Sequence, residues 1–125
     1  MNRVAVIKKH GLARKFIAEA LRECGHDVRE FDHPERFLES VEERPDCIVT
    51  GVWFDRDRYP SGVSLVGELG RQGACVPVVV FSFMKEYDQE VMDAGAYAFV
   101  FHNSYDFTEL ANLVSKAIAS APSLS

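Results

Sequence analysis

Long apolar runs, paired cysteines and an excess of basic residues are all missing from this sequence. No apolar segment approaches the roughly 18 residues that a membrane-spanning helix needs, so we expect no contact with a membrane. No signal peptide precedes the first strand pattern, and the three cysteines are odd in number and lack any Cys-x-x-Cys spacing. Because Cys24, Cys47 and Cys75 all stand in apolar surroundings, we expect reduced core thiols in a cytoplasmic protein.

The charge balance argues against nucleic acid as a partner. The chain has 14 lysines and arginines against 19 aspartates and glutamates, and its formal net charge is -5 at pH 7. A domain that binds nucleic acid without sequence preference is usually basic. A chain of 125 residues can bury a single core. We expect one domain over residues 1–120, followed by a flexible tail or the start of a linker over 121–125.

Five apolar runs typical of strands alternate with five helical patterns. Such strict alternation with short connections predicts an α/β fold, in which helices cover both faces of a parallel sheet. Strands three and four are almost continuously apolar, as in the middle of a sheet, and strand two alternates, as an edge strand does. The expected strands are Arg3–Ile7, Asp27–Phe31, Asp46–Val52, Val76–Phe81 and Tyr97–Phe101. The expected helices lie between Leu12 and Cys24, from Pro34 to Val41, between Val63 and Leu69, between Tyr87 and Met92, and between Phe107 and Ile118, with Gly25 and Gly95 ending the first and fourth.

In such a sheet, ligands and chemistry gather at the carboxyl ends of the strands. At these ends the chain resembles the receiver domain of bacterial response regulators, and the resemblance covers nearly its whole length. Receivers have two acidic residues after their first strand, where this chain has Lys8 and Lys9. Their third strand begins with Pro-Asp and ends in the aspartate that accepts a phosphoryl group. Here Pro45 and Asp46 match, and the acceptor position falls on Gly51.

Other parts of the receiver pattern are retained or exchanged. The run "VPVVVFS" ends in Ser82 as receivers end their fourth strand in Ser or Thr, and Phe99 occupies the place of a switch aromatic. His102 stands where receivers carry a lysine. The resemblance implies a three-layer, doubly wound, five-stranded parallel sheet with strand order 2-1-3-4-5, as in flavodoxin-like folds.

The exchanged residues remove the chemistry of an ordinary receiver. Three carboxylates hold Mg²⁺ there, and one of them attacks the phosphoryl group. Gly51 has no side chain, and the ammonium groups of Lys8 and Lys9 can only donate hydrogen bonds. Each lysine charge about 5 Å from a divalent cation would repel it by roughly 7 kcal/mol at an effective dielectric of about 20. We therefore expect no metal, no cofactor, no phosphorylation at this position and no enzymatic activity.

Three readings of Lys8 and Lys9 stay open at this stage. They are two solvated lysines, or one of them pairs with Asp55 or Asp57 in a long loop that folds over the pocket, or together with Ser82 and nearby amides they form an anion site. The sequence Asp55-Arg56-Asp57-Arg58 favours a solvated loop over a metal motif.

Two further chemical readings are weak. The four histidines lack the spacing of metal ligands. Ser82 lacks a G-x-S-x-G turn and an acid to orient His102, so a hydrolase is not indicated.

The leading hypothesis is a receiver-like signalling module of a bacterial two-component-type pathway that binds a protein partner without phosphorylation. The resemblance implies an interaction face on the fourth helix, fifth strand and fifth helix, with Tyr87, Phe99 and Tyr105 as candidate anchors and homodimerisation as a further expectation. One alternative is a receptor for a small anion or nucleotide in the Lys8/Lys9 pocket. Another is a phosphorelay protein whose acceptor is displaced to Asp55.

Overall fold

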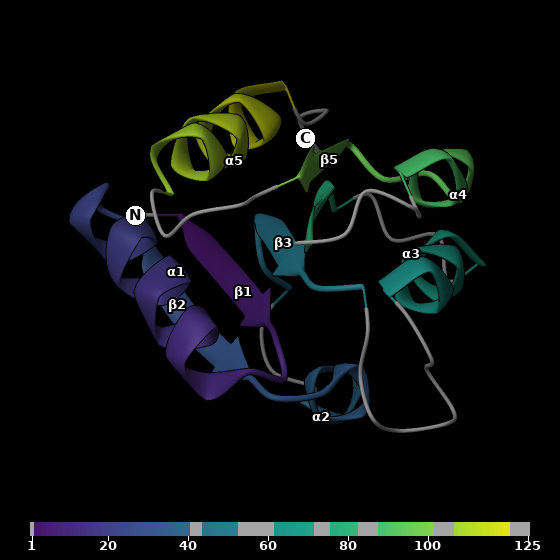
Figure 1. The fold of residues 1–125 in the computed structure, drawn as a ribbon, viewed down its shortest axis with the longest axis horizontal. Coiled ribbons are helices and arrows are strands. Elements are labelled where there is room, and N and C mark those ends of the chain that lie inside the picture. The colour runs from purple at the N-terminus through teal and green to yellow at the C-terminus, as the bar shows by residue number, and fades with distance from the viewer. Residues whose placement is uncertain are drawn as a thin grey trace.

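A five-stranded parallel sheet lies between two layers of helices in the computed structural model, which describes residues 2–40, 44–52, 62–71, 76–82, 88–101 and 107–120 (Figure 1). The strands are β1 (Arg3–Ile7), β2 (Asp27–Phe31), β3 (Cys47–Thr50), β4 (Val78–Ser82) and β5 (Ala98–Phe101). The helices are α1 (Gly11–Glu23), α2 (Pro34–Glu39), α3 (Gly62–Arg71), α4 (Asp88–Asp93) and α5 (Thr108–Ser120). This strict alternation confirms the predicted fold class.

The strand order is β2-β1-β3-β4-β5, as expected, and every neighbouring pair is parallel. The apolar strands β3 and β4 lie inside the sheet, and the alternating β2 lies at one edge. Ile7 of β1 pairs with Thr50 of β3, and the Gly51 N–H donates to the Ile7 carbonyl at 2.9 Å. This register brings Lys8 and Gly51 together at the carboxyl edge of the sheet.

Several element boundaries differ from the sequence predictions. The third strand is shorter than the predicted Asp46–Val52. The fourth begins at Val78 because Pro77 has no N–H to donate to the ladder, although its carbonyl accepts from Ile48 N–H at 3.0 Å. The fifth strand begins one residue later than predicted. The second helix ends at Glu39, and Val41 lies outside the described residues.

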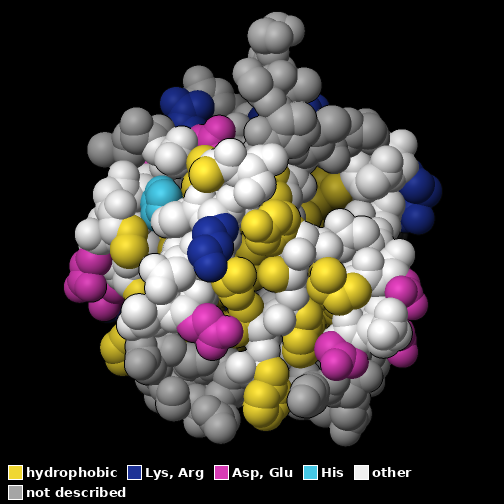
Figure 2. Space-filling view, turned by 90° about the horizontal axis from the view of Figure 1, so that it is seen from above, with side chains coloured by type: hydrophobic (Ala, Val, Ile, Leu, Met, Phe, Trp, Pro, Cys, Tyr) yellow, Lys and Arg dark blue, Asp and Glu magenta, His cyan; other side chains and the backbone are white. Residues whose placement is uncertain are grey.

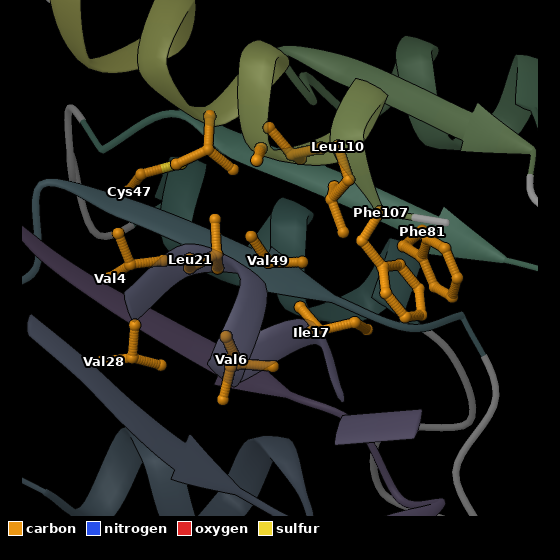
Figure 3. Close-up of a cluster of buried hydrophobic side chains, with 14 of the residues drawn as sticks. Val4, Val6, Ile17, Leu21, Val28, Cys47, Val49, Phe81, Phe107 and Leu110 are labelled. Atoms are coloured by element: carbon orange, nitrogen blue, oxygen red, sulfur yellow. The ribbon is translucent and has the colours of Figure 1, made fainter. Parts of the chain in front are cut away.

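Two apolar layers fill the space between the sheet and its helices. One lies under α1 and α5, where the rings of Phe81 and Phe107 have centroids 5.6 Å apart (Figure 3). The other lies under α2, α3 and α4 and includes Ile7, Ile48 and Leu65. Each fully buried side chain of this size contributes about 1.5–3 kcal/mol. The two layers therefore hold the ends of β1, β3 and β4 in a fixed arrangement.

The buried stripe of α1 is narrower than its apolar pattern. Ala13, Ile17 and Leu21 face the core, but Leu12 is 55% exposed and Phe16 is 42% exposed. A helix packed on one surface buries only part of its circumference. The apolar periodicity predicted the helix correctly and overestimated how much of it is covered.

The prediction of three core cysteines is wrong for Cys24, which is exposed because it follows the last turn of α1 as its C-cap. Cys47 is buried as expected, and burial raises the pKa of its thiol to about 12. It therefore stays a protonated, unreactive thiol. Cys75 lies outside the described residues. No helix within the described ranges is long and apolar enough to cross a bilayer.

Candidate functional site

The side chain of Lys8 lies over Gly51. A Cβ atom built on Gly51 would be 3.0 Å from Lys8 Cδ and 3.2 Å from Lys8 Nζ. The same Nζ lies 5.2 Å from the ring centroid of Phe81, within the range of a cation–π contact. The ammonium group of Lys8 thus fills the space into which a side chain at position 51 would project. The reading of two solvated lysines is wrong for Lys8, which is half-buried, whereas Lys9 is exposed.

Gly51 is not required by its backbone conformation. Among the described residues, positive φ angles occur at Gly25 (89°) and Gly95 (112°), where the chain turns after α1 and α4, and not at Gly51. The atoms that a side chain at position 51 would meet belong to Lys8. The two positions therefore form one structural unit, in which the absence of a side chain on β3 accommodates a long one from β1.

The backbone of Lys8 is held on two sides. Its N–H donates to the Phe31 carbonyl at 3.0 Å, and its carbonyl accepts from Arg14 Nη1 at 2.8 Å. Arg14 Nε in turn lies 3.5 Å from Glu30 Oε1. Nothing in the sequence pattern singles out Arg14, because its role depends on α1 folding back over the end of β1. These contacts fix the direction in which Lys8 leaves the strand.

Burial lowers the pKa of Lys8 from its ordinary value of 10.5. The cause is desolvation, which disfavours the charged form of an amine. The ammonium group therefore has a net electrostatic cost in the folded chain at neutral pH.

The described residues at this edge do not fit a magnesium ion. Mg²⁺ prefers oxygen ligands and usually takes one or two carboxylates from the protein. The described residues contain no group of three or more histidine, cysteine, aspartate or glutamate side chains placed to hold a metal. Thr50 contributes a hydroxyl, which donates to the Gly51 carbonyl at 3.1 Å. Lys8, which follows Ile7 at the end of β1, lies beside Gly51, and an ammonium group cannot ligate a cation.

The response regulator receiver domain family matches residues 4–115 of the chain. The chain belongs to this family. Solved structures agree on the fold: FixJ-N has a TM-score of 0.85 and 24% identity, covering 99% of this chain and 98% of its own. TrrA of Thermotoga maritima, solved in complex with Mg²⁺-BeF, has a TM-score of 0.83 and 20% identity, with coverages of 94% and 99%. The receiver domain of NtrX from Brucella abortus has a TM-score of 0.81 and 22% identity, with coverages of 94% and 99%. No curated protein sequence matches the chain.

The other site residues predicted for this receiver lie in two groups. Asp55, Asp57, Tyr87, His102 and Tyr105 fall outside the described residues, so the predicted loop contacts of Lys8 and Lys9 fall there too. Ser82 is buried at the end of β4, and Phe99 is half-buried against the layer under α3 and α4.

Two of the histidines have structural roles that the sequence did not reveal. His10 is the N-cap of α1, and its Nδ1 accepts from Ala13 N–H at 3.2 Å. His33 is the N-cap of α2, and its Nδ1 accepts from Glu35 N–H at 3.1 Å. Both therefore satisfy a helix N-terminus that would otherwise leave backbone donors unpaired.

Exposed apolar side chains gather where α4 and β5 meet. Met92 is 42% exposed, Tyr97 39% and Phe101 45%. Figure 2 shows the side of the receiver on which α5, β5 and α4 lie, where apolar side chains form a band across the middle and acidic ones stand at its margin. They lie on the predicted interaction face, but the anchors predicted there were Tyr87, Phe99 and Tyr105. The signal was present, because Tyr97, Phe99 and Phe101 are spaced by two and share one side of a strand.

Proposed function

We propose that this receiver signals without phosphorylation of an aspartate in β3, as a module that binds a protein partner in a two-component-type pathway. The observation that carries the proposal is the position of Lys8, whose Nζ would lie 3.2 Å from a Cβ on Gly51. An internal cation fills the space that a phosphoryl acceptor and its metal would need. A phosphoryl donor would meet neither a carboxylate acceptor nor Mg²⁺ there.

The composition of the two edge strands supports the proposal that this receiver binds a protein partner. The outer strand β2 reads Asp-Val-Arg-Glu-Phe and carries three charged residues, which protect an edge from unwanted pairing. The opposite edge, β5, reads Ala-Phe-Val-Phe and carries none. Phe101 on this strand and Tyr97 just before it are exposed aromatics, a residue type that is enriched at interfaces. An uncharged, aromatic edge is costly to leave in water, so a partner that covers it gains affinity.

The charge of α4 indicates what such a partner carries. Asp88, Glu90 and Asp93 are exposed within one six-residue helix that has no basic residue. A partner with basic residues beside an apolar strip would complement this surface. A second copy of the chain is a further candidate, although two copies joined edge to edge at β5 would bring their acidic α4 helices toward each other.

The proposal is tested by isolating a partner with the intact chain and comparing variants. Phe101→Ser should weaken binding by roughly tenfold or more, because truncating a central aromatic anchor costs over 1 kcal/mol. Phe16→Ser is the matched control, since Phe16 is equally exposed but lies on α1. It should leave binding unchanged, as should treatment with phosphoramidate and Mg²⁺.

Greater weakening by Lys8→Met than by Phe101→Ser would instead favour a small-ligand receptor built on the lysine pocket. Calorimetry against phosphate, nucleotides and cyclic dinucleotides would then identify the ligand class. Binding that appears only after treatment with phosphoramidate and Mg²⁺ would contradict the proposal.

A further inference from the structure

Lys8 differs from the other lysines of the described residues. Lys9, Lys15 and Lys116 are exposed, whereas Lys8 is half-buried against Gly51 and Phe81. Its backbone is fixed by Phe31 and Arg14, and its amine lies against Gly51 and Phe81 at the carboxyl edge of the sheet. This is the edge at which doubly wound sheets meet their small ligands.

We propose that Lys8 Nζ is an acylation site for small acyl phosphates, which transfer their acyl group to this amine where an aspartate would have taken the phosphoryl group. This inference rests on the proposed function, in which position 51 carries no phosphoryl acceptor. A nucleophile is still present in the pocket, but it is nitrogen, and an amine reacts at the acyl carbon to give a stable amide.

The reaction balances without any further reagent. The neutral amine of Lys8 attacks the acyl carbon, and a C–N bond forms. The bond from that carbon to the phosphate oxygen breaks, and its electron pair leaves with inorganic phosphate. The amine proton passes to water. The step needs the uncharged amine, and burial favours that form by lowering the pKa of Lys8.

Acylation would change the site in a defined way. The product has no charge, so the buried cation and its contact with the Phe81 ring are both lost. It is also larger than the amine, and the tight fit over Gly51 leaves no room for growth in that direction. The modified side chain must therefore leave the space over β3. Acylation would therefore give the pocket a second conformation, in which the Lys8 side chain no longer lies over Gly51.

The test treats the intact wild-type chain with acetyl phosphate and maps acetylated lysines by peptide mass spectrometry. Lys8 should be acetylated several-fold faster than Lys9, Lys15 or Lys116 at neutral pH. The advantage should shrink as the pH approaches 10.5, the ordinary lysine value, because an ordinary lysine amine is then about half uncharged. Phosphoramidate, a phosphoryl donor without an acyl group, should modify none of them.

Two variants sharpen the comparison. Lys8→Arg should remove the fast site and leave the other lysines unchanged. Gly51→Ala places a methyl group within about 3 Å of the Lys8 side chain and displaces it. In that variant the ratio of Lys8 to Lys9 acetylation should become independent of pH. If Gly51→Ala fails to fold, the pH series on the wild type still tests the inference.

Equal acetylation of all lysines, or a ratio that does not change with pH in the wild type, would overturn the inference. So would preferential acetylation of Lys9. A gain in mass of one phosphoryl group would instead refute the proposed function. Failure of the inference and failure of the proposed function are therefore distinguished by the mass of the added group.

Discussion

Replacing Gly51 by aspartate places a carboxylate at the position proposed to correspond to the receivers' phosphoryl acceptor. The variant distinguishes whether phosphorylation is prevented by the lack of a carboxylate at position 51 or by Lys8 beside it. The new Cβ would lie 3.0 Å from Lys8 Cδ and 3.2 Å from Nζ. The obstructing atoms are the far end of a flexible side chain, so Lys8 can withdraw. The ammonium and the new carboxylate would then remain neighbours and form an ion pair.

The size of this pairing decides the expected result. Two unit charges about 4 Å apart attract by roughly 4 kcal/mol at an effective dielectric of about 20, an upper bound for a group that keeps part of its solvation. A Mg²⁺ ion about 5 Å from Lys8 would in addition be repelled by roughly 7 kcal/mol. Both effects oppose metal binding, and without the metal the charge on the transferring group lacks its main stabiliser. Gly51→Asp alone should therefore remain unphosphorylated.

The assay is intact-mass spectrometry after incubation with phosphoramidate and Mg²⁺, a donor that cannot acetylate lysines. Wild type and Gly51→Asp should show no added phosphoryl group. A quadruple variant that combines Lys8→Asp, Lys9→Asp, Gly51→Asp and His102→Lys should incorporate one. Efficient incorporation in the single variant would show that Lys8 does not disable the pocket, and would refute the electrostatic reasoning.

Three further predictions concern stability, each measured by urea unfolding. Lys8→Met should raise the free energy of unfolding at neutral pH. The wild type should become more stable as the pH rises toward 10.5, because the unfolded chain then binds more protons than the folded chain. The variant should lack this gain in stability with pH. A loss of stability in Lys8→Met would contradict the desolvation argument. His26→Leu should stabilise by about 1 kcal/mol, because both ring nitrogens of His26 are buried without a hydrogen-bond partner; destabilisation would show that they have one. His10→Ala should cost about 1 kcal/mol and His10→Asn much less, since asparagine can also accept from the Ala13 N–H; equal losses would rule out a capping role.

The fold could be read from the sequence because each element obeyed a local rule. Strands β3 and β4 are buried on both faces and so appear as continuous apolar runs, and Gly25 and Gly95 end helices in the conformation that favours glycine. The errors came where tertiary packing decides the outcome. Cys24 and Phe16 continue an apolar helical pattern, yet both are exposed.

The candidate site could be located from the sequence but not built from it. The register of a parallel sheet places Lys8 beside Gly51, and that much follows from topology. That the lysine turns inward over Gly51 and contacts Phe81 depends on side-chain packing between three strands. The sequence alone left two solvated lysines as one of three readings, because it carries no signal for the burial of one amine next to an exposed one.

We propose that this receiver is not switched by phosphorylation at position 51, directly after β3. The most direct measurement is the intact mass of the wild-type chain after phosphoramidate and Mg²⁺ treatment, beside a receiver that carries the acceptor aspartate. The account predicts an unchanged mass for this chain and the addition of one phosphoryl group to the control. A phosphoryl group on the wild-type chain, mapped to the carboxyl edge of the sheet, would contradict it.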